Sequence, residues 1–352
     1  MKLTIKTLTP LWTGGVETGK VDRIHETGIL GSLRWWYEAL VRGLGGWACD
    51  PSQNTCGFDT EKYQKSKVVS ERQRLRDAGL CDVCQLFGAT GWRRRFRLMI
   101  QDSTCPDKTV SPKIEIKHSY ADKEGEEKTR TSTWYFPADL QDKPRSGQIT
   151  IQIQSLTQGF QPEIIAGLIQ FVANWAAIGA RAQMGFGVIE PVNGRIETQA
   201  LYDWLIARAD SKTYSSLPSL QSIFLAKIRP KDPNSPFNEQ SPFALKYGLR
   251  RLFASDQKLR HFIMGTVKDG RIAAKVKMSR PYNNEIRAWG WIPETADVYK
   301  GKWNRNAVVD AINQYLNANY TLQVWREMNS PRDTVTPNIG DAKEFLRSLL
   351  GL

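Results

Sequence analysis

The order of strand-like and helix-like segments in the first 192 residues restricts the fold more than any other feature of this chain. Residues 2–8 alternate between polar and apolar side chains as a strand does, and apolar residues at helical spacing follow over 32–44. Strand-like runs come next, and an apolar helix with proline near its first turn then spans 162–178. These runs are 96–101, 113–117, 133–136 and 148–154. A glycine-rich loop and a closing strand over 188–192 complete a split β-α-β order.

The second half of the chain contains a less regular series of the same kind. Its expected helices are 201–209, 243–253, 307–316 and a tail helix over 341–350, capped by Asp341. Its expected strands are 222–228 and 287–292, with a hairpin of 261–267 and 272–278 around Asp269 and Gly270. We therefore predict an α+β fold of two ferredoxin-like domains, the RNA-recognition type, over 1–198 and 199–352. The first domain carries a polar insertion at about 47–92.

Length and hydrophobicity limit the class of protein. A chain of 352 residues favours two domains. No run of eighteen apolar residues occurs, so the sequence predicts no membrane span. The N-terminal stretch MKLTIKTLTP lacks the apolar centre of a signal peptide, so we expect a cytoplasmic protein.

The net charge of +13 is concentrated in two windows. Residues 65–97 contain nine basic and three acidic residues, and residues 243–287 contain eleven basic and three acidic ones. Such concentration suggests a polyanionic partner, most simply nucleic acid. The alternative is solvated surface charge with no partner.

Five cysteines in a cytosolic chain argue against a disulfide framework. Cys81 and Cys84 form a C-x-x-C pair, and Cys49 and Cys56 lie upstream in a polar loop. Four thiolates can hold one tetrahedral structural zinc and stiffen an insertion too polar to pack by itself. The C-x-x-C spacing alone is weak evidence, since thiols that bind no metal share it. Cys105 is left over as an ordinary thiol.

Two glycine-containing segments are the best candidates for binding a phosphate chain. The first, GILGSLRWWYEALVRGLGG over 28–46, places Gly31, Arg34 and Trp35 at an expected helix entrance, where amides and the helix dipole favour phosphate. The polar connection before it adds Lys20 and Arg23. The second segment is the glycine loop, GARAQMGFG over 179–187. Its glycines permit close approach of a ligand, and its candidate residues are Gly179, Arg181, Gly185 and Gly187.

Aromatic and basic residues elsewhere extend these candidates. Trp36 shares the apolar stripe of its helix, so it is the expected core residue. Trp35 then stacks on a base, meets a partner subunit or is buried under the insertion. Arg93, Arg94 and Arg95 follow Trp92, and either track an RNA backbone or form a solvated turn with salt bridges. A second basic surface is expected from Lys246, Arg250, Arg251, Lys275, Lys277 and Arg280.

Catalytic motifs are missing from the sequence. There is no G-x-S-x-G elbow, P-loop or H-E-x-x-H, and the three histidines have no metal-ligand spacing. Asp82 and Asp102 lie near basic residues and are candidates for metal-dependent phosphodiester cleavage. However, nothing in the sequence pairs them. We therefore expect a protein that binds without catalysing a reaction.

Four motifs in order resemble the RAMP superfamily of CRISPR proteins, and within it the first subunit of the type III-B effector, the Cmr complex. They are LTPLWTGG, GILGSLRWWYEAL, CDVCQLFGATGWRRRFRL and GARAQMGFG, with RAWGW over 287–291 as a weaker echo. The resemblance covers roughly the first 190 residues. It implies two ferredoxin-like domains without a nuclease centre, and a zinc-bearing insertion around the CDVCQLFG cysteines.

The resemblance also implies partners and a role. Such a subunit holds the 3′ region of the guide RNA, helps to capture target RNA and contacts other Cmr subunits. Carried over by residue, the glycine loop together with Arg23, Gly31 and Arg34 would contact RNA. Two alternatives remain open at this point: an endoribonuclease that processes guide RNA or cuts target RNA, and a scaffold whose basic windows face other proteins.

Overall fold

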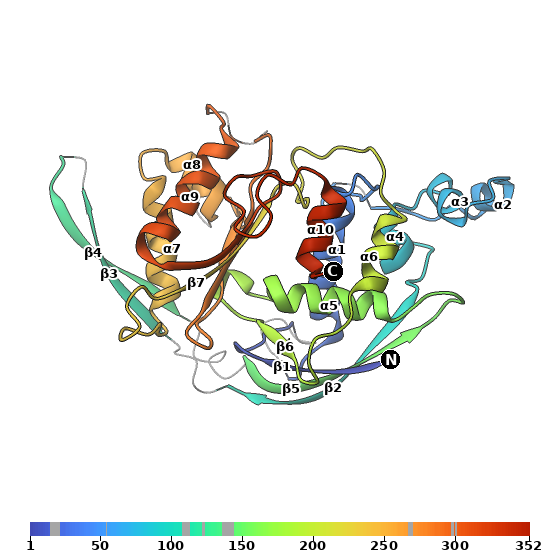
Figure 1. Ribbon diagram of the computed structural model, residues 1–352, viewed down its shortest axis with the longest axis horizontal. Coiled ribbons are helices and arrows are strands. Elements are labelled where there is room, and N and C mark those ends of the chain that lie inside the picture. The colour runs from blue at the N-terminus through green and yellow to red at the C-terminus, as the bar shows by residue number, and fades with distance from the viewer. Residues whose placement is uncertain are drawn as a thin grey trace.

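The computed structural model describes residues 1–14, 22–53, 55–107, 113–121, 124–135, 144–266, 270–296, 299 and 301–352. Over these residues the chain forms two four-stranded antiparallel sheets, each covered by helices, and a two-stranded ribbon that projects from the body (Figure 1). The two sheets are built from consecutive halves of the sequence.

The first sheet has the order β2-β5-β1-β6. Its strands are β1 (Lys2–Thr7), β2 (Phe96–Pro106), β5 (Arg145–Ser155) and β6 (Ile189–Pro191). All neighbouring strands are antiparallel, and the two crossovers contain helices α1 (Glu26–Gly43) and α5 (Glu163–Trp175). Counted along the sheet, the strands run second, third, first, fourth, which is the ferredoxin-like order.

The second sheet repeats this topology with the order β10-β7-β9-β8. Its strands are β7 (Ile223–Arg229), β8 (Val276–Met278), β9 (Ile286–Trp291) and β10 (Thr321–Arg326). Helices α7 (Ser241–Leu252) and α8 (Gln257–Met264) fill the first crossover, and α9 (Arg305–Asn319) fills the second. The predicted α+β class with two ferredoxin-like units is therefore confirmed.

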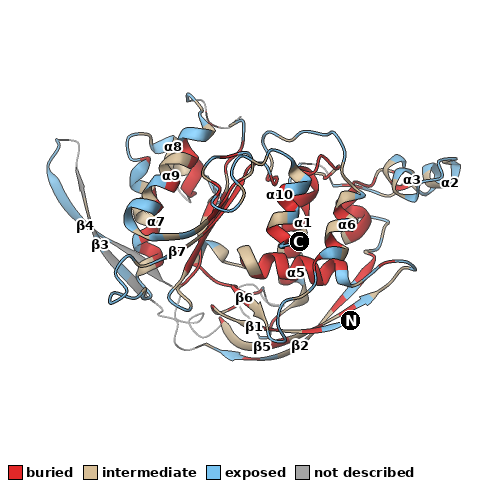
Figure 2. Ribbon diagram, viewed as in Figure 1, coloured by how far each residue is buried: buried red, intermediate tan, exposed pale blue. Residues whose placement is uncertain are grey.

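The larger hydrophobic core lies between the first sheet and its helices, and it includes elements from the second half of the chain (Figure 2). Helix α6 (Gln199–Ile206) contributes Leu205, and helix α10 (Ala342–Leu350) contributes Phe345 and Leu349. Asp341 caps α10 as predicted, because its carboxylate accepts the amides of Lys343 and Glu344. The C-terminal helix of the chain therefore packs into the core of the first sheet. The division of the chain into two domains at residue 198 stays a prediction.

The insertion contains three short helices, α2 (Thr60–Lys65), α3 (Glu71–Asp77) and α4 (Asp82–Phe87). Asp82 is fully buried, and its carboxylate forms ion pairs with Arg72 at 2.7 Å and with Arg76 at 2.6 Å. Basic residues of the first charge window thus hold the insertion together. The projecting ribbon consists of β3 (Lys113–Ala121) and β4 (Glu127–Tyr135).

Two local predictions were wrong. Helix α1 begins at Glu26, so Gly28 and Gly31 lie inside it and Arg34 is beyond its first turn. The first arm of the expected hairpin over 261–278 is largely helix α8, which Asp256 caps by accepting the Leu259 amide. Thr266 and Ile272 form an antiparallel bridge, as a hairpin predicts, and the short strand β8 follows; residues 267–269 lie outside the described residues. Leu259 and Phe262 are three residues apart and both pack on the second hydrophobic core from α8. The prediction of a strand here followed alternation and overlooked this helical spacing.

Candidate functional site

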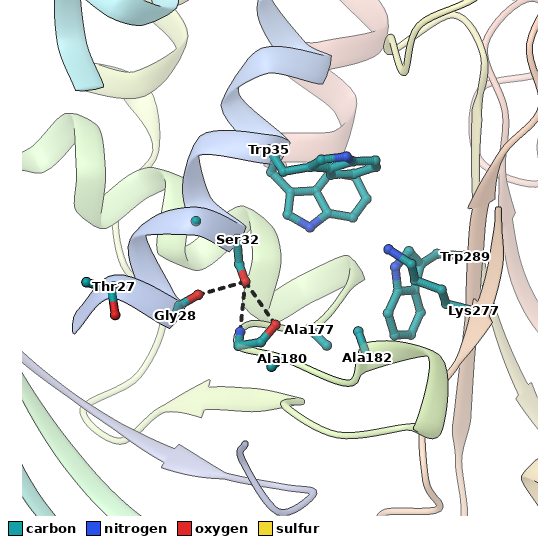
Figure 3. A pocket seen from close by; sticks show the side chains of 12 residues that line it. Thr27, Gly28, Ser32, Trp35, Ala177, Ala180, Ala182, Lys277 and Trp289 are labelled. Atoms are coloured by element: carbon teal, nitrogen blue, oxygen red, sulfur yellow. Dashed lines mark hydrogen bonds between the residues drawn. The ribbon is translucent and has the colours of Figure 1, made fainter. Parts of the chain in front are cut away.

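The two glycine-containing segments meet at one cleft of about 330 Å³. Ser32 of α1 joins them, since its hydroxyl donates to the carbonyl of Gly179 at 3.2 Å and accepts the Gly179 amide at 2.8 Å (Figure 3). Strands β8 and β9 of the second sheet close the opposite wall. We call this space the Trp35 cleft. Its lining comprises Thr27, Gly28, Gly31, Ser32, Trp35, Trp36, Ala177, Gly179, Ala180, Ala182, Lys277 and Trp289.

Aromatic rings and one cation dominate the side chains of the Trp35 cleft. Trp36 is buried as predicted, and Trp35 packs edge-on against it and is partly buried. The Lys277 ammonium lies 5.2 Å from the centre of the Trp35 ring, and burial holds the pKa of Lys277 below its ordinary value. Gly31 lines the Trp35 cleft beside open space, because a Cβ there would meet no atom within 4 Å. A planar group with an attached anion suits such a surface.

The glycines of the loop are explained by packing within the protein. Gly179, Gly185 and Gly187 all have positive φ, at 83°, 89° and 92°. A Cβ at Gly187 would lie 1.8 Å from the Ile178 carbonyl oxygen, and one at Gly185 would lie 2.4 Å from the Arg280 amide nitrogen. Each glycine therefore allows another part of this chain to approach closely.

The amides of the loop are largely engaged as well, contrary to the expectation that they face a phosphate. Ala180 donates to the Trp12 carbonyl, Gly187 to the Pro10 carbonyl, and Gly179 to Ser32. Short turns inside the loop take the amides of Met184 and Gly185. Anion binding at this loop therefore depends on its side chains.

Arg181 is the loop's cationic side chain and has an unusual backbone. Its φ is 58°, in the left-handed region, and its guanidinium carbon lies 4.0 Å from the centre of the Trp12 ring. Burial lowers the pKa of Arg181. Phe186 is fully buried, its ring centre lies 5.8 Å from that of Trp12, and it covers the loop.

The four predicted cysteine ligands converge. The sulfur atoms of Cys49, Cys56, Cys81 and Cys84 all lie within 4.8 Å of one another, and those of Cys49 and Cys84 are 3.7 Å apart. Zinc–sulfur bonds of about 2.3 Å in a tetrahedron separate sulfurs by about 3.8 Å, so the cluster fits one zinc ion. Cys105 is exposed and takes no part.

Hydrogen bonds among the four sulfurs hold the pKa of Cys49 and Cys56 below the ordinary value and raise the pKa of Cys81 and Cys84. Amides of Cys81 and Cys84 donate to Cys56 and Cys81 sulfurs at 3.4 Å, and the Arg34 guanidinium donates to Cys84 at 3.2 Å. Hydrogen bonds from neighbouring thiols lower the pKa of Cys56 to about 7, although the Cys49 sulfur, its strongest neighbour, acts the other way. Burial acts to lower the pKa of Arg34, but the Cys84 and Glu38 charges outweigh it and raise that pKa. Arg34 is thus committed to the cysteine cluster and to Glu38 at 3.0 Å.

A sequence model of the RAMP superfamily matches residues 4–190, more than half of the chain. The chain belongs to the RAMP superfamily. Among curated proteins, none matches it.

Solved structures similar to this RAMP protein share little sequence with it. Cmr1 from Pyrococcus furiosus in its apo form is 14% identical with a TM-score of 0.45, over 90% of this chain and 96% of the other. A chain of type III-B Cmr-beta bound to cognate target RNA and AMPPnP, in the presence of single-stranded DNA, is 11% identical with a TM-score of 0.42, over 90% and 98%. A chain of Cmr-beta bound to cognate target RNA is 12% identical with a TM-score of 0.41, over 90% and 99%.

The remaining predicted cations of this RAMP protein do not gather at the Trp35 cleft. Arg95 and Lys275 are buried and donate to the carbonyls of Gln85 and Phe262. Burial lowers the pKa of Lys275 to about 8. Their role in RNA binding stays a prediction, and the same holds for the others. Arg23 pairs with Glu26, and the exposed Arg93 donates to the Leu156 carbonyl. Arg94 is half-buried, and Arg250 donates to the Gly265 carbonyl. Lys20 lies outside the described residues.

Sequence reasoning missed two residues of the cleft, Ser32 and Trp289. Ser32 looks like an ordinary helix residue, and only its contact with Gly179, 147 positions away, reveals its role. Trp289 belongs to the RAWGW segment, and the weak resemblance of that segment to the RAMP motifs was the sequence feature that pointed to it. In the described part of the chain, no helix is both long and apolar enough to cross a membrane.

Proposed function

We propose that this RAMP protein is a non-catalytic, RNA-binding subunit of a type III-B CRISPR effector. In this role it holds the 3′ region of the guide RNA, helps to capture target RNA and contacts other Cmr subunits. One observation carries the proposal: two of the four segments that resemble RAMP motifs line the Trp35 cleft, which contains three tryptophans and Lys277. The likeness of the motifs to the first Cmr subunit supports the assignment to this effector.

The chemistry of the cleft suits single-stranded RNA. A tryptophan at the surface of a cleft contributes about 1–3 kcal/mol when a base stacks on it, whichever base is present. Trp35 is partly buried and lines the Trp35 cleft. Lys277 beside it, and Arg181 on the adjoining loop, supply positive charge for the phosphates. Neutralising phosphates releases counterions and makes binding weaken with salt. Sequence would then be read by pairing between guide and target, not by the protein.

The carboxylates of the protein support a non-catalytic role. Among the described residues, the lining of the Trp35 cleft contains neither histidine nor carboxylate, and Lys277 is its one titratable side chain. Asp82 is held by two arginines inside the insertion. Asp102 accepts the Ile24 amide at 2.8 Å and the Thr104 hydroxyl at 2.6 Å. Incubating the protein with labelled RNA, with and without Mg²⁺, tests the rival: specific products abolished by a point substitution would favour an endoribonuclease.

We further propose that the cysteine cluster holds one structural zinc ion. Cys49 and Cys56 come from the loop before α2, and Cys81 and Cys84 from the start of α4. A zinc ion would therefore join the two ends of the insertion. Through Arg34 it would also fix the insertion against α1, the helix that carries Trp35.

RNA affinity measured at several salt concentrations tests the proposed function. Lys277→Met should weaken binding of a single-stranded RNA about tenfold and lower the salt slope by about one unit. Arg181→Ala should act in the same direction. The matched control is Lys65→Met, which removes an exposed lysine of α2 that pairs with Glu61. Unchanged affinity and slope in both cleft variants would contradict the proposal.

A further inference from the structure

A second cavity, of about 530 Å³, lies between the two halves of the chain and shares no lining residue with the Trp35 cleft. Its walls come from the end of α5, the turn after β6, strand β7, the β8–β9 turn and the end of α10. We call it the Lys227 pocket. Its volume is within the roughly 300–1,000 Å³ typical of small-molecule sites.

Two cations of the pocket are held by aromatic rings and not by carboxylates. The Lys227 ammonium lies 5.3 Å from the centre of the Trp175 ring, and the Arg287 guanidinium carbon lies 5.1 Å from that of Tyr282. Within the described residues, neither cation forms an ion pair. Burial and the neighbouring Arg287 hold the pKa of Lys227 below its ordinary value, and the Glu285 charge acts in the opposite direction. Positive charge kept in this way is available to an anion.

The other charged groups of the pocket are occupied. Arg195 donates to the Leu350 and Gly351 carbonyls, which places it on the end of α10. Glu190 pairs with Lys6 at 2.5 Å. Glu285 accepts the hydroxyl of Tyr282, and that hydroxyl accepts Arg287 Nε at 2.5 Å. Both carboxylates therefore have hydrogen-bond or ion-pair partners other than Lys227, although the Glu285 charge still acts on Lys227. Arg287 also donates through Nη1 to the Ala176 carbonyl at 3.1 Å, so Lys227 is the principal anion-binding group and Arg287 adds positive charge beside it.

Uncharged polar groups complete the pocket. Asn174 lines it and is held in place because its Oδ1 accepts the Gln170 amide at 2.7 Å, which leaves Nδ2 to donate to a ligand. Asn283, in the β8–β9 turn, is exposed and has a left-handed backbone with φ of 47°. A simple phosphate is too small for a cavity of this size. The amide edges and ring edges suit a planar heterocycle attached to the anion.

We propose that the Lys227 pocket binds a nucleoside phosphate, with the phosphate against Lys227 and Arg287 and the base at Asn174. The ligand is either a free mononucleotide or the phosphorylated end of an RNA chain, which share this chemistry. The pocket does not depend on RNA binding in the Trp35 cleft, so the two proposals stand or fall separately.

Calorimetric titration of the full chain with AMP, inorganic phosphate and adenosine tests the proposal. AMP should bind at least tenfold more tightly than phosphate or adenosine. Lys227→Met should weaken AMP at least tenfold, and Asn174→Leu should weaken AMP without affecting phosphate. Lys65→Met, which removes the exposed lysine of α2, should leave AMP binding unchanged. Melting temperatures near that of the parent protein confirm that the variants fold.

The source of the ligand follows from competition. A dinucleotide with a terminal phosphate that displaces AMP assigns the pocket to an RNA end, and failure to displace it assigns the pocket to free nucleotides. Three results would overturn the proposal: no AMP binding, AMP binding no tighter than that of phosphate, or AMP binding unaffected by Lys227→Met.

Discussion

The substitution Gly187→Ala tests whether the glycine loop is shaped by the protein's own packing. An alanine Cβ would lie 1.8 Å from the Ile178 carbonyl oxygen, on a backbone whose φ is 92°. The residue cannot move away freely, because its amide donates to Pro10 and its carbonyl accepts the Ile178 amide, both at 2.9 Å. The left-handed backbone costs about 1–2 kcal/mol, and overpacking costs about 1–3 kcal/mol. We expect a total loss of about 4 kcal/mol in the free energy of unfolding.

Gly194→Ala is the matched control. Gly194 has a similar φ of 85°, yet a Cβ there would meet no atom within 4 Å. The free energy of unfolding of this variant should fall only by the cost of the left-handed backbone, about 1 kcal/mol. Urea unfolding followed by tryptophan fluorescence measures both losses. Equal losses in the two variants would refute the packing explanation and return the glycines to a role in ligand approach.

Three further predictions concern the cysteine cluster and the buried carboxylates. Elemental analysis should find one zinc ion per chain in the parent protein and in Cys105→Ser but none in Cys84→Ser, which should also destabilise the insertion. Asp82→Asn should cost about 3–5 kcal/mol of unfolding free energy in urea titration, because two arginines lose a buried partner. Burial acts to raise the pKa of Asp333, but hydrogen bonds from backbone amides and Arg326 outweigh it and hold that pKa below its ordinary value. The stabilisation from Asp333 is therefore present above about pH 4 and is lost as pH falls through the lowered pKa. In unfolding measurements between about pH 5 and pH 2, the free energy of unfolding should fall less steeply in Asp333→Asn than in the parent protein.

Local patterns in the sequence were enough to predict the framework of the fold. Alternation identified β1, and an apolar run with proline near its first turn identified α5. Helical spacing placed Trp36 in the core and Trp35, which is partly buried, off the apolar stripe. These features depend on period and burial, which neighbouring residues reveal. The start of α1 was missed because two glycines resemble a turn, yet the helix continues through both.

Roles that depend on distant partners were beyond sequence reasoning. Arg34 seemed placed for a phosphate, but Cys84, fifty positions away, takes its guanidinium. Lys275 belonged to a basic window, but it is buried against Phe262. Charge counts locate cations along the chain and do not show which of them the protein itself uses.

Crosslinking of the assembled effector tests the central claim most directly. Ultraviolet irradiation of the complex loaded with guide and target RNA, followed by mass spectrometry, identifies the peptides that carry nucleotides. The Trp35 cleft predicts crosslinks in the peptide of α1 that contains Trp35 and in the peptide of β8 that contains Lys277. Crosslinks confined to other surfaces, with both of these peptides unmodified, would contradict the claim.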